Sequence, residues 1–261
     1  MFLIFDTETT GLPKRWDAPI SDINNWPRVV QLAWQLHEDN GVLISNKSYL
    51  IKPTDFDIPF ESEKVHGIST MLASQNGADV QTVLDEFLKD LKSCEYIVGH
   101  NLKFDINVVA SELFRLDIEN QLLNKVVLDT CTENTANVCK LPGGKSGKFK
   151  FPTLVELYEN LFKNKFENAH NASADVEANA MVFFELIRQK LFDPNLIQDF
   201  ENFHKKVSGT FSNKVSTFGI NHINLKAESK KLKEQNQTEK LNTDDLVNNN
   251  SNSDYVHLHN N

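Results

Sequence analysis

The order of the predicted strands and helices constrains the fold of this chain more than any other feature. Three β-rich segments come first, and the last two flank the turn Asp39-Asn40-Gly41, which predicts a β-hairpin. Short apolar strands then alternate with helices. We expect strands at Phe2–Asp6, Val29–Glu38, Val42–Ile51, Tyr96–Gly99 and Val126–Leu128. This order predicts an α/β fold whose mixed sheet has three antiparallel strands, then parallel ones, with helices on both faces.

Helices are predicted where apolar residues recur at a spacing of three and four. Thr153 and Glu156 form a capping box that opens one of these helices. The apolar positions on the four helical faces are Val80, Val83, Leu84, Phe87, Leu88 and Leu91; Ile106, Val109, Leu113 and Leu116; Leu154, Leu157, Tyr158 and Leu161; and Val176, Ala180, Phe183 and Ile187.

Apolar periodicity stops after about residue 205. Residues 205–261 contain 11 Asn together with many Lys and Ser, a composition that is typical of segments without a packed core. We therefore predict a folded domain at residues 1–204 and a flexible Asn/Lys-rich tail or linker at residues 205–261.

The net charge of −9 is unevenly distributed. Residues 205–261 carry 8 Lys and 6 acidic residues, so residues 1–204 hold 19 basic and 30 acidic residues, a balance of −11. Such a domain cannot coat DNA by neutralising phosphates. It can hold a strand end locally if bound metal ions offset its carboxylates, and it would profit from a partner that delivers the substrate.

No membrane segment or export signal is predicted. No stretch reaches about 18 uninterrupted apolar residues, and the N-terminal segment has neither a basic region nor a cleavage site. The three cysteines, Cys94, Cys131 and Cys139, contain no Cys-x-x-Cys pair, which favours reduced thiols over disulfides or a zinc site. These features predict a cytoplasmic protein that does not bind membranes.

Four carboxylates occupy strand ends and helix starts, where α/β sheets build their sites. Asp6 and Glu8 are two residues apart at the end of the first strand, so both point to the same face. Asp105 and Asp175 lie near the starts of two helices. If these acids converge, they repel one another unless divalent cations lie between them. Ligands that are all oxygens favour Mg²⁺ or Mn²⁺ over zinc.

His170 precedes Asp175 by five residues. Two metal ions can stabilise the attacking and leaving oxygens of a phosphoryl displacement, and the reaction also needs a base that deprotonates water. Imidazole titrates near neutral pH, so His170 is the candidate general base.

Three motifs carry these residues in order: FDTETTGL (Phe5–Leu12), GHNLKFD (Gly99–Asp105) and HNASAD (His170–Asp175). They resemble the exonuclease motifs of the DEDDh (DnaQ-like) family, which includes the proofreading epsilon subunit of bacterial DNA polymerase III. The resemblance covers roughly residues 1–190. It implies a ribonuclease H-like fold and the release of nucleoside monophosphates from DNA 3′ ends with two Mg²⁺ or Mn²⁺.

The same resemblance assigns individual roles. Asp6, Glu8, Asp105 and Asp175 match the metal ligands, and His170 matches the general base. Thr9 and Leu12 match positions that touch the terminal nucleotide, and the segment Val65–Ser69 makes His66 a weaker candidate contact. Asn101 is the better substrate candidate in its motif, because we expect the neighbouring His100 to form structural hydrogen bonds. The implied partner is a replicative DNA polymerase subunit.

Other segments leave alternatives open. Leu12–Arg28 contains Lys14, Arg15, Trp16 and Trp26; we expect a loop packed on the sheet by its tryptophans, with nucleic-acid stacking as the alternative. Gly143–Ser146 lacks the first glycine of a P-loop, so it indicates a flexible basic loop. Tyr255–His259 (YVHLH) resembles the start of the metal-binding domain that opens polymerase alpha subunits, a match short enough to arise by ancestry or by chance.

The leading hypothesis is a metal-dependent 3′→5′ DNA exonuclease that proofreads during replication. An exoribonuclease or a repair exonuclease is the alternative within the same chemistry, because the reaction acts on phosphate and ignores the sugar. The alternative from another class is a catalytically silent module that binds a polymerase. The presence of all five catalytic residue types argues against the silent module.

Overall fold

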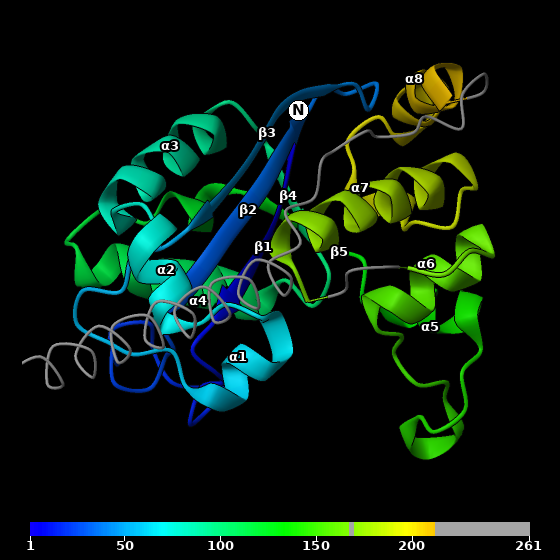
Figure 1. Ribbon diagram of the computed structural model, residues 1–261. Coiled ribbons are helices and arrows are strands. Elements are labelled where there is room, and N and C mark those ends of the chain that lie inside the picture. Colours follow the sequence, from blue (N-terminus) through cyan, green and yellow to red (C-terminus); the bar gives the residue numbers. More distant parts are fainter. Residues whose placement is uncertain (167–169, 212–261) are drawn as a thin grey trace, which may run out of the picture. The chain divides into compact units, whose positions relative to one another are not determined.

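A five-stranded mixed sheet forms the centre of the described part of the chain, residues 1–166 and 170–211 of a computed structural model (Figure 1). Its strands are β1 (Phe2–Thr9), β2 (Val29–His37), β3 (Leu43–Leu50), β4 (Tyr96–Gly99) and β5 (Val126–Asp129), in the order β3-β2-β1-β4-β5. β2 is antiparallel to both β1 and β3, whereas β4 runs parallel to β1, and β5 parallel to β4. The predicted α/β fold is confirmed.

Eight α-helices accompany these strands within the described residues. They are α1 (Phe60–His66), α2 (Thr70–Asn76), α3 (Val80–Lys92), α4 (Lys103–Arg115), α5 (Glu133–Cys139), α6 (Leu154–Phe162), α7 (Ala172–Arg188) and α8 (Phe200–Phe211). The four predicted helices correspond to α3, α4, α6 and α7. The predicted capping box is present at α6, where Thr153 Oγ1 accepts from the Glu156 backbone N–H and Glu156 Oε2 accepts from that of Thr153.

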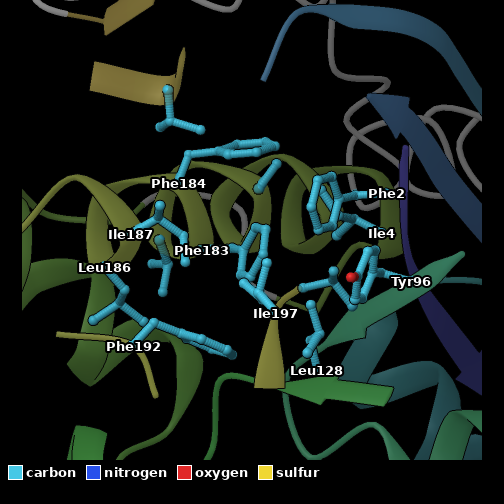
Figure 2. Close-up of a cluster of buried hydrophobic side chains, with 14 of the residues drawn as sticks. Phe2, Ile4, Tyr96, Leu128, Phe183, Phe184, Leu186, Ile187, Phe192 and Ile197 are labelled. Atoms are coloured by element: carbon cyan, nitrogen blue, oxygen red, sulfur yellow. The ribbon is translucent and has the colours of Figure 1, made fainter. Parts of the chain in front are cut away.

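Helices cover both faces of the sheet because successive residues of β1 point in opposite directions. Phe2 and Ile4 belong to the core beneath α6, α7 and α8, whereas Leu3 and Phe5 belong to the core beneath α3 and α4. In the first core, shown in Figure 2, the Phe2 ring lies 5.4 Å from the ring of Phe183 and 4.9 Å from that of Tyr96. β1 is therefore buried on both faces along its apolar half.

One prediction about burial is wrong. The apolar run Val126–Leu128 predicts a strand that is buried throughout, but the side chains of Val126 and Val127 are 40% and 44% exposed. Only Leu128 is fully buried. β5 lies at the edge of the sheet, and an apolar run does not by itself distinguish an edge strand from a central one.

Helix α8 crosses the predicted domain boundary between residues 204 and 205. Val207 is fully buried, and the Phe211 ring stacks on Phe184 with ring centroids 5.7 Å apart. Residues 205–211 therefore pack on the domain, and the rest of the predicted tail, including Tyr255–His259, lies outside the described residues.

The structure describes all three cysteines and the helices that bear on membrane crossing. Cys94, Cys131 and Cys139 are free thiols, as expected. Among residues 1–166 and 170–211, no helix combines the length and the apolar character that crossing a membrane requires.

We predict that a chain ending at residue 204 unfolds several degrees below one ending at residue 211. Burial of a Val or Phe side chain contributes about 1.5–3 kcal/mol, and 1 kcal/mol shifts the thermal midpoint of a domain of this size by about 2–4 °C. Val207→Ala in the longer chain should produce part of the shift. Equal midpoints of the two truncated chains by circular dichroism would show that α8 does not stabilise the domain.

Candidate functional site

The acidic end of β1 lies under the first turn of α7. Asp6 and Glu8 continue the row of Phe2 and Ile4, so their side chains point to the face that α7 covers. Asp6 pairs with Ala33 and Glu8 with Gln31 on the neighbouring strand β2, and the register of this pairing shifts after Glu8. This irregularity ends the regular pairing beside the acidic pair.

Helix α7 begins at fixed contacts that place Asp175 in its first turn. The Asn171 side chain caps the helix by accepting from the backbone N–H groups of Ser173 and Ala174. Gln31 Oε1, on β2, accepts from the Ala172 backbone at 3.2 Å. These bonds tie the start of α7 to the sheet at the height of Glu8, because Gln31 is the cross-strand partner of Glu8.

Asp6, Glu8 and Asp175 together form a group that could hold a metal ion. Each offers one carboxylate oxygen, and these three oxygens all lie within 4.8 Å of one another. A set of oxygen donors at such spacing suits a hard divalent cation such as Mg²⁺ or Mn²⁺. The structure thus brings together three of the four predicted ligands, from two elements that lie far apart in the sequence.

Asp105, the fourth predicted ligand, approaches the same strand from the other side. It lies in the first turn of α4 and is 4% exposed. Its Oδ1 accepts from the Thr7 hydroxyl at 2.6 Å and from the Thr7 backbone N–H at 3.0 Å. Thr7 faces α4 because it lies between Asp6 and Glu8, so β1 presents its two acids toward α7 and the Thr7 hydroxyl toward Asp105 of α4.

The four carboxylates interact electrostatically. Burial, followed by repulsion from Asp105, Asp175 and Glu8, raises the pKa of Asp6 well above its usual value. Burial raises the pKa of Asp105 to about 7 in spite of the Thr7 hydrogen bonds, and burial with repulsion from Asp105 raises that of Asp175 to about 7. The site therefore disfavours its own negative charge, and a bound cation would offset that charge.

His170 adjoins this group through its backbone. Its N–H donates to Asp175 Oδ2 at 3.0 Å, and its side chain is exposed. Its φ of 66° lies in the left-handed region, which is uncommon for a residue other than glycine. The loop thus holds the backbone of His170 beside Asp175, while the side chain reaches solvent.

The predicted substrate residues occupy different environments. Thr9 is buried, and its hydroxyl donates to the Gly11 carbonyl at 2.7 Å, which shapes the turn that follows β1. Leu12 is 72% exposed, and the Asn101 side chain also reaches solvent. His66 is buried at the end of α1, where Nδ1 accepts from the Ile68 backbone N–H. Contact of these residues with substrate remains a prediction.

His100 forms structural hydrogen bonds, as expected: its Nδ1 pairs with Thr130 Oγ1 and its Nε2 with the Pro152 carbonyl, each at 3.0 Å. Asp129 was not predicted. It accepts from the backbone N–H groups of Asn101, Leu102 and Cys131 and so fixes the turn before α4. Its place at the end of a strand is the signal that could have identified it.

The structure bears on the two loops with open interpretations in different ways. Trp26 packs in the core, as predicted, but Trp16 is 53% exposed, so the tryptophans do not both hold the loop on the sheet. In the basic loop, Lys148 pairs with Glu133 and Lys150 with Glu156, so these charges are partly neutralised.

The raised pKa values predict how stability without metal depends on pH. An acid whose pKa is raised in the folded state supports folding while it is protonated, and this support is lost as pH rises from about 4 through about 7. In EDTA, the thermal midpoint should therefore fall between about pH 5 and about pH 8, and Mn²⁺ should restore it mainly at the higher pH.

Asp175→Asn provides the comparison that isolates the site. Burial lowers the pKa of His37 to about 4, so the contribution of His37 makes stability rise with pH. This contribution is the same in the variant and in the unmodified protein, and it cancels when the two are compared. The variant should lose less stability than the unmodified protein over the same pH interval. Identical pH profiles with and without Asp175 would contradict the assigned repulsion.

Comparisons with known proteins agree with this geometry. The 3′-5′ exonuclease DinG of Bacillus subtilis is 31% identical over 189 residues, which cover 72% of this chain and 18% of DinG. DNA polymerase III subunit epsilon of Rickettsia conorii is 28% identical over 192 residues, 73% of this chain and 76% of that subunit.

A solved structure of E. coli exonuclease I in complex with a dT13 oligonucleotide superposes with a TM-score of 0.54 and 20% identity. The match covers 72% of this chain and 40% of exonuclease I, and it supports the predicted ribonuclease H-like fold. The model of one protein family, described as exonuclease (RNase_T), matches residues 3–183. This match spans well over half of the sequence and includes all four acids and His170, and the chain therefore belongs to the exonuclease family.

Proposed function

We propose that this chain is a metal-dependent 3′→5′ exonuclease that releases nucleoside monophosphates from DNA 3′ ends. The observation that carries the proposal is the group of Asp6, Glu8 and Asp175, whose carboxylate oxygens lie within 4.8 Å of one another in a member of the exonuclease family. A surface cluster of acids without a function would gain nothing from such repulsion.

The names of the relatives support the direction of cleavage and the substrate. DinG is named a 3′-5′ exonuclease, and exonuclease I was solved with a DNA oligonucleotide. The epsilon subunit, of which this chain covers 76%, belongs to a DNA polymerase. These properties of the relatives, applied to this chain, favour DNA as its substrate and a replicative polymerase subunit as its partner.

The residues at the site fit divalent cations. Their donor atoms are all carboxylate oxygens. Burial, with repulsion from neighbouring acids, raises the pKa of Asp6, Asp105 and Asp175, and bound cations would stabilise the charged carboxylates that burial disfavours. Asp6, Glu8 and Asp175 would hold one Mg²⁺ or Mn²⁺, and Asp105 would take part in holding a second. When bound, two such ions stabilise the attacking and leaving oxygens of phosphodiester hydrolysis.

The chain itself supplies the proton transfer. His170 would take a proton from the attacking water, whose oxygen forms a bond to phosphorus while the bond to the upstream 3′ oxygen breaks. The products are a nucleoside 5′-monophosphate and a strand with a new 3′ hydroxyl group. An imidazole that reaches solvent from a loop, and whose backbone is bonded to Asp175, suits this role.

Proofreading in the cytoplasm with a polymerase is the biological role that we propose. A domain with a balance of −11 binds free DNA weakly, so a partner that presents the 3′ end would compensate for the missing electrostatic attraction. Thr9, Leu12, Asn101 and, more weakly, His66 would contact the terminal nucleotides.

The test is a single-stranded oligonucleotide with a 5′ label, offered as DNA and as RNA with Mg²⁺. We expect a ladder that shortens from the 3′ end with DNA and is removed by EDTA. A ladder from RNA alone would replace the DNA proposal with an exoribonuclease. Intact DNA and RNA would favour the catalytically silent polymerase-binding module.

Substitutions test the assigned roles. Asp6→Asn should abolish cleavage because it removes a metal ligand, whereas Asp85→Asn, which changes an exposed carboxylate of α3, should leave the rate unchanged. His170→Ala should slow cleavage by about 10²–10⁴-fold, the usual contribution of a general base. Full activity of His170→Ala at neutral pH would show that another group accepts the proton.

A further inference from the structure

The loop between β1 and β2, Leu12–Arg28, is bonded along the length of α4. Ser111 Oγ donates to the Ile20 carbonyl at 3.1 Å, and the Arg115 guanidinium donates to the carbonyls of Ile23 and Trp26 at 2.7 and 2.8 Å. These bonds hold the backbone of the loop against the helix whose first turn carries Asp105.

A buried acid fixes the base of this loop. Glu112, 1% exposed, accepts from Arg28 Nε at 2.9 Å and from the Val29 backbone N–H at 3.0 Å, and it pairs with Arg115 at 3.3 Å. A buried, hydrogen-bonded charge is costly to disrupt. The loop therefore returns to β2 at a fixed point.

Bonds inside the loop determine its conformation. The Asn25 side chain accepts from the Arg15 backbone N–H at 2.8 Å and donates to the Arg15 carbonyl at 3.0 Å. Trp26 is 3% exposed and donates from its indole nitrogen to the Pro19 carbonyl. Since the Asn25 side chain forms hydrogen bonds to the backbone of Arg15, the residue before Trp16, contacts within the loop determine where Trp16 lies.

The order of the contacts along α4 locates Trp16. Ile23 lies at Arg115 in the last turn, Ile20 lies at Ser111, and Trp16 lies at Phe104 in the first turn, with ring centroids 5.9 Å apart. The loop thus runs along the helix from its C-terminal end toward Asp105. Trp16 therefore lies at the end of α4 that carries Asp105.

Trp16 differs from the other two tryptophans in its exposure. Its side chain is 53% exposed, whereas Trp26 and Trp34 are 3% and 0% exposed. Isolated exposed apolar residues are common on proteins, so exposure alone indicates nothing. Here, however, the indole rests on Phe104, and the exposed cations Lys14 and Arg15 precede it. Neither cation takes part in any of the ion pairs among the described residues.

We propose that Trp16 stacks on a base of the single strand upstream of the scissile linkage, while Lys14 and Arg15 bind its phosphates. The inference rests on the proposed nuclease function and specifies which feature of the strand this loop recognises. Stacking on an aromatic ring accepts any base, and local cations supply the attraction that an acidic domain lacks. A base inside a duplex cannot offer its face, so the contact favours frayed or single-stranded ends.

Steady-state kinetics test the contact directly. Trp16→Ala should raise KM for a single-stranded DNA by about 10-fold, the usual effect of losing one stacked base, with kcat nearly unchanged. Trp16→Phe should retain most of the affinity. Leu123→Ala is the matched control, because Leu123 is 75% exposed and precedes β5, at the opposite end of the parallel strands.

DNA strands that carry one abasic site test whether a base is the partner of Trp16. In the unmodified protein, one upstream abasic site should raise KM by about 10-fold, whereas in Trp16→Ala the same site should add no further penalty. An effect of Trp16→Ala that persists in full on the abasic strand would overturn stacking. Equal KM values for Trp16→Ala and Leu123→Ala on the intact strand would also overturn it.

Fluorescence separates this inference from the proposed function. Trp16 is the exposed emitter among the three tryptophans, so binding of an oligonucleotide with phosphorothioate 3′ linkages should quench its emission in the intact protein. Quenching that disappears in Trp16→Phe would support the contact even if no DNA were cleaved, and the nuclease proposal alone would then fail. Saturable binding without quenching, or no binding at all, would contradict the contact whatever the activity.

Discussion

Repulsion among carboxylates at the end of β1 is the constraint on which the rest of the site depends. A strand buried on both faces ends near Asp6 and Glu8; α7 brings a carboxylate oxygen of Asp175 within 4.8 Å of theirs, and α4 brings Asp105 to Thr7 between them. Burial raises the pKa of several of these groups, so the fold must hold them together against their charge. The packing of α7 on one face of the sheet and of α4 on the other stabilises this arrangement of the acids.

The fold was largely predictable where periodicity extends over several turns or strand residues. The hairpin, α3, α4, α6 and α7 follow from such patterns, whereas α1, α2 and α5 have seven residues each and offer too few repeats. Helix α8 was missed although Phe200, Phe203 and Val207 recur at helical spacing. The neighbouring Lys205 and Lys206 made this helix resemble the polar segment that follows it.

The grouping of Asp6, Glu8 and Asp175 in the candidate site was predictable because few residue types can offer oxygen ligands to a cation. Acids placed at strand ends and helix starts indicated the elements that carry this group, and period two placed Asp6 and Glu8 on one face. What the sequence could not supply were contacts made across the chain. Three such contacts are hydrogen bonds: Thr7 to Asp105, Gln31 to the start of α7, and Asp129 to the turn before α4. These residues are of ordinary types, and their roles depend on the register of the sheet.

The attachment of the Leu12–Arg28 loop has a consequence for how such a protein can change over evolutionary time. Its anchors, Glu112, Ser111 and Arg115, lie in the second half of α4, whereas the acids of the candidate site lie on β1, on α7 and in the first turn of α4. Mutations or insertions near the exposed part of the loop can therefore change its surface without moving a carboxylate. Under the proposed role of the loop in binding the strand, selection can act on substrate preference and on reaction chemistry as nearly independent traits.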